Sequence, residues 1–341
     1  MTSSQDIRWL SAAVRLGERQ NGQSWPNPAV GCLLVRDDVV VGSGVTGQGG
    51  IPHGETRALS AAGDRARGAT CYVSLEPCNH HGRTPPCTNA LMEAGVKRVV
   101  IALGDPDPRV SGSGARRLES AGIEVSFEPD QGCRRAAQRA HRGHIRRMTT
   151  KRPFVTLKLA LSADGGVGFA EQGQVAITSE QTNKLMHGLR SQMDAIAVGG
   201  RTWRLDKPQL NVRLSGLEHR SPQRIVFSNS ADEDDVWAFS GQRLEDDLFD
   251  ISTRGIGTLL LEGGASLANS FLGARLVDEL ILLRGAPTLG ADSLKPFAVN
   301  PFENTAGAGL GDWQKIDVRR IGDDTLWVLT PPTSTETQAA A

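Results

Sequence analysis

The sequence has no excess of either charge, since 38 Lys and Arg side chains balance 38 Asp and Glu side chains. A neutral chain creates no strong global field that would attract nucleic acid or an anionic membrane. No run approaches the ~18 consecutive apolar residues that cross a bilayer, and residues 1–20 contain no continuous apolar stretch typical of a secretion signal. We therefore expect a cytoplasmic protein that acts on neither a membrane nor a nucleic acid.

Cysteine is scarce, and its number is odd: the five are Cys32, Cys71, Cys78, Cys87 and Cys133. In a long chain without a secretion signal, an odd number argues against a disulfide framework and for a reducing compartment. These residues are therefore expected to be thiols or metal ligands. Cys32, Cys71 and Cys133 fall inside predicted strands or helices and are interpreted as packing residues.

The length of 341 residues is large for one core and predicts two domains. In the first half the patterns predict a β-hairpin, then strands alternating with helices, which suits a mixed sheet covered by helices. The predicted helices are 5–19, with Ser3 or Ser4 as cap, 53–64, 87–94 and 114–121; the predicted strands are 29–35, 39–45, 69–75, 97–103 and 123–127.

Residues 133–152 contain eight Arg or Lys and no acid. This segment is either a nucleic-acid patch or a solvated helix that joins two domains, and the neutral chain favours the helix. We place the domains at 1–147 and 153–331, with a disordered tail over 332–341.

The second half is again expected to alternate strands and helices. Predicted strands are 154–165, 194–200, 224–228, 257–264, 279–285, 313–322 and 325–331; predicted helices are 179–192, with Ser179 as cap, and 265–276. Residues 199–213 are expected to form a loop, and residues 229–256 are too weakly patterned to assign.

One group of residues in the first half predicts a zinc site. His53 and Glu55 open a predicted helix, and Cys78 and Cys87 follow the next predicted strand. One imidazole and two thiolates give the three protein ligands of a catalytic zinc, whose bound water has a pKa lowered to roughly 7. Glu55 can then move a proton without binding the metal, as in the H-x-E…P-C arrangement of zinc nucleobase deaminases.

Two other interpretations of these cysteines stay open. They are buried thiols, or they belong to a structural zinc site with His80 or His81 as a fourth ligand. The catalytic interpretation instead puts these histidines in the wall of a substrate pocket. Eight residues separate Cys78 from Cys87, and among them Arg83 is a donor suited to a phosphate.

The second half lacks GxGxxG after its first strand, so a Rossmann domain is not expected. Two segments stand out instead. The stretch 199–213 combines glycines with Thr202, Asp206 and Arg213, and the stretch 261–270 is a strand, a Gly-Gly turn and the start of a helix. Such a turn favours a phosphate, although each segment is also compatible with a plain surface loop or a tight turn.

Three stretches of the first half carry a family resemblance: NPAVGCLLV (27–35), HGETRAL (53–59) and SLEPCNHHGRTPPC (74–87). They resemble the bifunctional deaminase/reductases of riboflavin biosynthesis. The resemblance implies a cytidine-deaminase-like α/β/α sandwich in which His53, Cys78 and Cys87 bind zinc. It also implies that Glu55 is the proton shuttle and that Asn27 contacts the pyrimidine. Gly54 stands where the family usually has Ala.

The second half is similar to the reductase domain of the same family, which has a dihydrofolate-reductase-like α/β fold. The similarity implies a substrate site of Arg190, Leu210, Arg213 and Glu262. It further implies an NADPH site of Ala160, Ala176, Thr202, Asp206, Gly264, Ala265, Ser266, Leu267, Ala268, Asn269 and Ser270. Gln174 and Ala176 stand where the family usually has Ser and Trp, and Lys207 replaces an Asp.

The resemblance therefore implies two consecutive reactions. The first is hydrolytic deamination of 2,5-diamino-6-ribosylamino-4(3H)-pyrimidinone 5′-phosphate, and the second is NADPH-dependent reduction of ribosylamino to ribitylamino. A deaminase with a degenerate reductase half and a zinc deaminase that edits nucleic acid are the alternatives. A homo-oligomer, either a dimer or a tetramer, is also expected.

Overall fold

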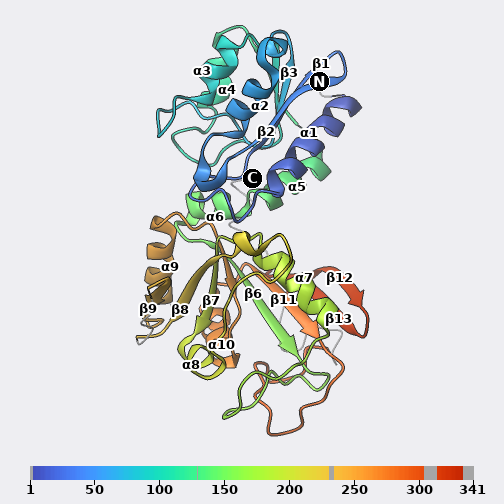
Figure 1. The fold of residues 1–341 in the computed structure, drawn as a ribbon, viewed down its shortest axis with the longest axis vertical. Helices are drawn as coiled ribbons and strands as arrows, with labels where there is room; N and C mark the ends of the chain where they lie inside the picture. The colour runs from blue at the N-terminus through green and yellow to red at the C-terminus, as the bar shows by residue number, and fades with distance from the viewer. Residues whose placement is uncertain (1–2, 129, 230–233, 303–312, 333–341) are drawn as a thin grey trace. The chain divides into compact units, whose positions relative to one another are not determined.

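The chain divides into two units in the computed structural model, which describes residues 3–128, 130–229, 234–302 and 313–332 (Figure 1). The first unit contains residues 1–153 together with 249–257, and the second contains 154–248 and 258–341. The predicted disordered tail falls, apart from residue 332, outside the described residues. No described helix is long and apolar enough to cross a membrane.

The first unit is built on a five-stranded mixed sheet in the order β2-β1-β3-β4-β5. Strand β1 pairs antiparallel with β2 and β3, whereas β3, β4 and β5 are parallel. Asp37 and Asp38 turn the first hairpin with positive φ angles of 50° and 61°, the backbone that a two-residue hairpin turn requires. The strands are β1 (Gly31–Arg36), β2 (Val39–Val45), β3 (Thr70–Val73), β4 (Arg98–Ile101) and β5 (Glu124–Phe127).

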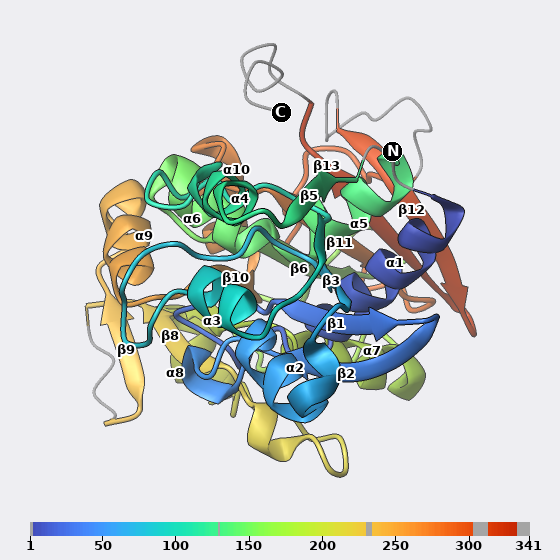
Figure 2. The ribbon, with the colours of Figure 1, turned by 90° about the horizontal axis from the view of Figure 1, so that it is seen from above.

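Helices cover both faces of this sheet (Figure 2). Helices α2 (Gly54–Ala62), α3 (Cys87–Glu93) and α4 (Ser113–Ser120) pack on one face. Helices α1 (Ser4–Glu18) and α5 (Gln131–Ala140) pack on the other. Successive residues of β1 alternate between the two cores, Cys32 and Leu34 on one side and Leu33 and Val35 on the other, as strand geometry requires. The predicted α/β/α sandwich is confirmed.

The basic segment differs from its prediction. It forms two helices, α5 and α6 (Arg142–Thr150), that meet at His141. Helix α5 is no solvated connection, because Cys133, Ala137 and Ala140 are buried against helix α1 and the sheet. These three small residues recur at helical spacing, so the arginines between them occupy the opposite face. The prediction overlooked the apolar stripe because it is narrow.

The second unit contains an eight-stranded sheet in the order β12-β13-β11-β6-β10-β7-β8-β9. Strand β13 is antiparallel to both of its neighbours, and the strands from β11 to β9 are parallel. The strands are β6 (Phe154–Leu161), β7 (Ala195–Gly199), β8 (Gln223–Phe227), β9 (Val236–Phe239), β10 (Thr258–Leu261), β11 (Glu279–Arg284), β12 (Gln314–Ile321) and β13 (Asp324–Thr330). The parallel core is nearly continuous in buried aliphatic residues, as expected when both faces are covered.

Two segments of the second half contain helices or strands that the sequence did not predict. Helix α8 (Gly200–Asp206) occupies half of the predicted 199–213 loop, and 229–256 contains strand β9 and helix α9 (Leu244–Thr253). A seven-residue helix after a Gly-Gly pair is too short for a periodic pattern to identify. The remaining helices are α7 (Glu180–Arg190) and α10 (Ala265–Gly273), with short 3₁₀ turns η1 (Gln48–Gly50), η2 (Gly63–Ala66) and η3 (Glu218–Arg220).

Candidate functional site

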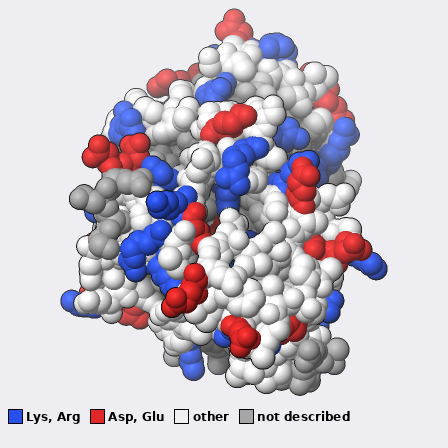
Figure 3. Space-filling view, turned by 60° about the horizontal axis from the view of Figure 1, so that its bottom comes forward, with Lys and Arg blue, Asp and Glu red and all other residues white. Residues whose placement is uncertain are grey.

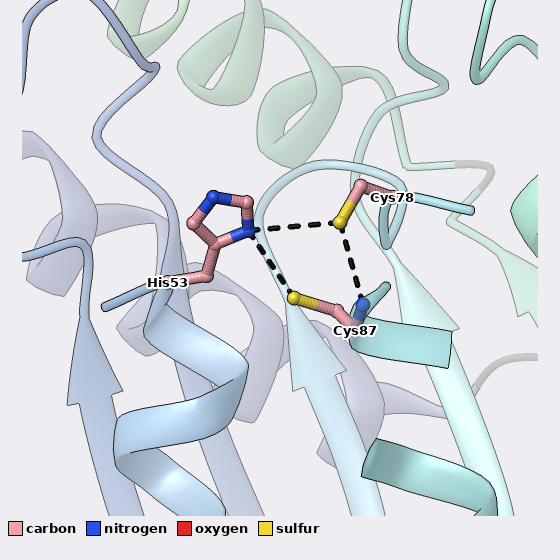
Figure 4. Close-up of side chains that lie close together, drawn as sticks. All are labelled: His53, Cys78 and Cys87. Atoms are coloured by element: carbon pink, nitrogen blue, oxygen red, sulfur yellow. Dashed lines mark hydrogen bonds between the residues drawn. The ribbon is translucent and has the colours of Figure 1, made fainter. Parts of the chain in front are cut away.

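Three side chains of the first unit converge with the geometry of a metal site (Figure 4). His53 Nδ1 lies 3.2 Å from Cys87 Sγ and 3.6 Å from Cys78 Sγ, and the three ligand atoms all lie within 4.8 Å of one another. Zinc bonds of ~2.3 Å to sulfur and ~2.0 Å to nitrogen place tetrahedral ligand atoms roughly 3.5–3.8 Å apart. The residues therefore fit a zinc ion.

The ends of two helices and one strand position these ligands. His53 is the N-cap of α2, Cys87 is the first residue of α3, and Cys78 follows β3. Backbone N–H of Cys87 donates to Cys78 Sγ over 3.4 Å, which holds the two ends together. Gly54 is needed beside the first ligand, because a Cβ there would meet the carbonyl oxygen of Val30 at 2.4 Å.

The local charges favour a thiolate next to an imidazole. Hydrogen bonds from the Cys87 thiol and from His53 lower the pKa of Cys78 to about 4, although burial opposes the shift. The hydrogen bond to Cys78, together with burial, raises the pKa of Cys87. The bond to Cys78 also raises the pKa of His53. Soft thiolates and imidazole are the donors that zinc selects.

Glu55 lies directly beside the ligands and is only 3% exposed. Its Oε2 is buried without a hydrogen-bond partner among the described residues. Burial first, and then the negative charge of Cys78, raise its pKa to about 7. A carboxyl group that gains and loses a proton near neutral pH suits general acid–base catalysis.

A cavity of about 250 Å³ opens above the ligands. Its walls include Asn27, His80 and Arg83, together with Glu55, whereas His81, which was also predicted to lie in the pocket wall, does not line it. Asn27 Nδ2 lies 3.4 Å from His53 Nε2 and donates to the Gly50 carbonyl at 2.8 Å. Among the described residues only three side chains make up the metal cluster, so neither His80 nor His81 supplies a fourth ligand.

Further polar residues of this cavity were missed by the sequence reasoning, among them Glu76, Asp105, Asp107 and His144. Glu76 and Asp105 follow the parallel strands β3 and β4. The carboxyl ends of neighbouring parallel strands meet at one edge of a sheet, where ligands bind, and this rule could have found both residues. His144 carries no such signal, because it lies in the basic segment that was interpreted as solvated.

A second cavity, of about 550 Å³, lies in the second unit. It is large enough for a dinucleotide, and its walls include small and polar residues on which such a cofactor could rest. Eleven of the predicted residues line it: Ala160, Arg190, Thr202, Asp206, Leu210, Glu262, Gly264, Ala265, Ser266, Leu267 and Ser270.

The charged floor of this cavity is an ion pair. Arg190 donates to Glu262 through Nε at 2.8 Å and Nη2 at 2.7 Å, and the two side chains are 15% and 12% exposed. Burial would raise the pKa of Glu262, but the hydrogen bonds from Arg190 and the nearby Lys158 lower it to about 2. Leu210, which also lines the cavity, has a φ of +52°, a strained backbone of the kind that gathers at functional sites.

Four predicted residues lie outside the walls of the second cavity: Ala176, Arg213, Ala268 and Asn269. Ala268 is fully buried, whereas the Arg213 side chain is exposed. The backbone N–H of Arg213 donates to His187 Nδ1 at 3.3 Å. A turn that binds phosphate through its backbone does not need every side chain on the wall, so the position of Ala268 is compatible with such a turn.

The surface carries no dominant patch of one sign on the face drawn in Figure 3, where basic and acidic side chains are interspersed. The net charge of the chain is also zero. This face therefore lacks the continuous basic surface that binds a nucleic-acid backbone.

Two protein-family models match the chain. Residues 3–103 match the zinc-binding region of cytidine and deoxycytidylate deaminases, and residues 153–327 match the RibD C-terminal domain. Among curated proteins, the chain is similar to riboflavin biosynthesis protein RibD of Haemophilus influenzae, with 34% identity over 96% of this chain and 98% of the other. RibD of Escherichia coli is 35% identical over 94% of this chain and 98% of its own length.

Solved structures are also similar to the chain over nearly its whole length. A RibD structure from Acinetobacter baumannii aligns with a TM-score of 0.85 and 33% identity, and the alignment covers 96% of this chain and 99% of the other. A deaminase/reductase from Thermotoga maritima aligns with a TM-score of 0.81 and 28% identity over the same shares.

Proposed function

The chain belongs to the RibD family of riboflavin-biosynthesis proteins, and from this membership we propose which of its residues carry each reaction. It is a bifunctional enzyme, a zinc-binding pyrimidine deaminase fused to an NADPH-dependent reductase. The observation on which the residue assignment depends is the convergence of His53, Cys78 and Cys87 beside the buried carboxyl group of Glu55.

In the deaminase, His53, Cys78 and Cys87 would hold zinc, which supplies a Lewis acid that makes water nucleophilic at neutral pH. Glu55 would take one proton from that water and pass it to the ring nitrogen, and would then pass a second proton, from the hydroxyl group added to the ring carbon, to the amine that departs as ammonia. Its raised pKa of about 7 supports both transfers. Asn27, His80 and Arg83 line the cavity and are proposed to orient the pyrimidine and its sugar phosphate.

In the reductase, the second cavity would hold NADPH, which supplies a hydride to the sugar carbon C1′. We assign the cofactor to Ala160, Ala176, Thr202, Asp206 and the turn 264–270. We assign substrate binding to Arg190, Leu210, Arg213 and Glu262. The buried pair of Arg190 and Glu262 supports this division, since it sets a fixed charge pattern in the floor against which a ribosylamino group can be oriented.

The boundaries 1–147 and 153–331 for deaminase and reductase also remain proposals. The matched region that begins at residue 153 supports the start of the reductase, and the first matched region, residues 3–103, lies inside the proposed deaminase.

The partner of this enzyme is a small molecule. We further propose that it acts in the cytoplasm as a dimer or tetramer. The five free cysteines are compatible with a reducing compartment. Strand β12 is an edge of the second sheet and exposes Ile316 and Val318, the type of edge that a second copy can cover. Light scattering of the purified protein measures the oligomeric state.

The test of the two activities is metal analysis combined with a one-pot assay of the diamino substrate. We expect about one zinc per chain, release of ammonia, and a reduced product only when NADPH is present. Removal of zinc by a chelator should stop ammonia release while the deaminated substrate is still reduced. Ammonia release that continues without metal would refute the proposed site. Absence of NADPH binding would instead favour a degenerate reductase.

A further inference from the structure

A histidine–aspartate pair, His144 and Asp105, lies in the wall of the deaminase cavity, and neither residue is a metal ligand. His144 Nε2 donates to Asp105 Oδ1 over 2.8 Å, and both side chains are only 8% exposed. Asp105 follows β4, His144 lies on α6, and both line the cavity. The contact therefore joins two distant segments at the place where substrate is bound.

The two oxygens of Asp105 have different surroundings. Oδ1 also accepts a hydrogen bond from the backbone N–H of Asp107 over 2.9 Å, so it already accepts two hydrogen bonds from groups of the cavity wall. No hydrogen bond to a described residue is formed by Oδ2. A nearly buried carboxylate is costly unless charged or polar donors compensate it. His144 is the only side chain among the described residues that donates to Asp105.

The neighbouring charges cannot replace this donor. Arg109, the nearest cation in the sequence, is committed to Asp107 through Nε at 3.0 Å and Nη2 at 2.5 Å. Glu76, which follows the adjacent strand β3, accepts hydrogen bonds from the backbone N–H groups of Gly112 and Gly114. His141 bonds to Ser74 instead, and burial, followed by the nearby His144, lowers the pKa of His141 to about 4.

We propose that His144 is a positioning residue of the deaminase, which fixes Asp105 so that its second oxygen accepts a hydrogen bond from the substrate. The partner group is an N–H or O–H donor, either a ring amino group or a ribose hydroxyl group of the aminopyrimidine nucleotide. This inference rests on the proposed deaminase function. It assigns substrate binding, rather than the chemical step, to the pair.

The test measures ammonia release by His144→Leu, His144→Gln, Asp105→Asn and the double variant His144→Leu/Asp105→Asn. Loss of one charge-assisted hydrogen bond predicts a KM that is about ten-fold higher in His144→Leu, with kcat and zinc content close to those of the wild type. Gln keeps a donor at the same reach and should restore most of the KM. The double variant should match Asp105→Asn alone, because His144 acts through Asp105.

His141→Leu is the matched control, since it also removes a buried imidazole and its hydrogen bond but lies outside the cavity walls. It should lower stability and leave KM unchanged. Wild-type zinc content reports that the first unit of each variant is folded, and reduction of the deaminated substrate reports the same for the second unit. A zinc-loaded His144→Leu protein with wild-type KM would overturn the inference. An impaired His144→Gln protein, equal to His144→Leu, would overturn it as well, because packing rather than the donor would then matter.

Two substrates identify the donor. The free triaminopyrimidine base has the ring amino groups and no ribose. If His144→Leu raises KM for this base as well, the ring amino group meets Asp105; if the effect appears only with the nucleotide, a ribose hydroxyl group does. A wild-type protein that releases no ammonia would contradict the deaminase proposal itself, which separates that failure from failure of the positioning role.

Discussion

The two cavities treat charge differently, although their walls span similar lengths of chain, from residue 27 to 148 and from residue 158 to 294. In the first, the metal-ligand cluster and Glu55 lie within residues 53–87, and one oxygen of Glu55 has no hydrogen-bond partner among the described residues. In the second, the principal acid is already paired, Glu262 with Arg190. The carboxyl group of the first site is therefore available for proton transfer, whereas the ligands of the second must fit an existing charge pattern.

Replacing Glu55 by Gln should give the largest effect and should separate the two sites. Without a group that carries the proton, kcat for ammonia release is expected to fall about 10³-fold. Zinc content and reduction of the deaminated substrate should stay at wild-type levels, as measured by metal analysis and NADPH oxidation. Glu93→Gln, an exposed acid on α3, is the matched control and should change neither reaction. An active, zinc-loaded Glu55→Gln enzyme would show that another group moves the proton.

The difference between the sites also explains what sequence could predict. The ligands His53, Cys78 and Cys87 lie in short motifs next to helix and strand ends, so local patterns were sufficient to identify them. Asp105 and His144 meet only because the segment that follows β4 lies beside α6 in the fold, and no local pattern predicts that contact. The α/β class was predicted because strand and helix periodicities are strong in both halves, whereas the two fold types were implied by the family resemblance.

Weak or short patterns account for the errors. Helix α8 has only seven residues, fewer than two full turns after its Gly-Gly start, and a pattern of that length is not periodic enough to recognise. In α5, arginines are as numerous as the three small buried residues, and composition suggested solvent where the spacing of Cys133, Ala137 and Ala140 indicated a core.

Acid should weaken both units through one matched pair of buried carboxylates. In the first unit, burial opposes ionisation of Asp6, but hydrogen bonds from Arg98, the Ser3 N–H and Tyr72 lower its pKa from 3.8 to about 2. In the second, Glu262 is lowered from 4.5 to about 2. A carboxyl group whose pKa is lower in the folded than in the unfolded protein stabilises the fold at a pH above its unfolded-state pKa. This stabilisation is lost as the pH falls through the folded-state pKa, so for these two groups the loss is expected between roughly pH 4 and pH 2.

The expected loss is about 2 kcal/mol for Asp6 and about 3 kcal/mol for Glu262. Hydrogen exchange read by mass spectrometry at pH 7 and at pH 2.5 resolves the two units separately. Asp6→Asn should flatten the acid dependence in the first unit alone, and Glu262→Gln in the second alone. If either substitution flattened both, the units would not be independent in their response to acid.

Arg213→Ala is expected to act on the reductase step only. Loss of one guanidinium that binds a sugar phosphate predicts a KM about ten-fold higher for the deaminated substrate. Deamination should be unchanged, and the free energy of unfolding should be nearly unchanged because the side chain is exposed. Arg243→Ala removes another exposed cation, which pairs with Asp246 and does not line the cavity, and should leave KM as it is. A normal KM in Arg213→Ala would leave Arg190 as the phosphate ligand and would narrow the reductase site to its buried pair.

The smallest effects are expected when helix caps are removed, and one cap from each unit is compared. Ser3 caps α1 by accepting the Asp6 N–H at 3.2 Å, and its loss in Ser3→Ala should cost about 1 kcal/mol. Ser179 caps α7 by accepting the Thr182 N–H at 3.3 Å, and it also donates to buried Asp324 at 2.7 Å. Ser179→Ala removes both bonds and should cost about 2 kcal/mol.

Denaturant unfolding combined with hydrogen exchange of α1 and α7 measures each cost in its own unit. Ser4→Ala is the control for the first helix, since Ser4 is exposed and lies within α1 rather than at its cap. Equal costs for Ser3→Ala and Ser179→Ala would mean that Asp324 gains nothing from the second hydrogen bond. The acid would then be held by Thr182 Oγ1 and the Ser179 N–H alone. A higher cost for Ser179→Ala would show that the hydrogen bond to buried Asp324 stabilises the start of α7 beyond the cap itself.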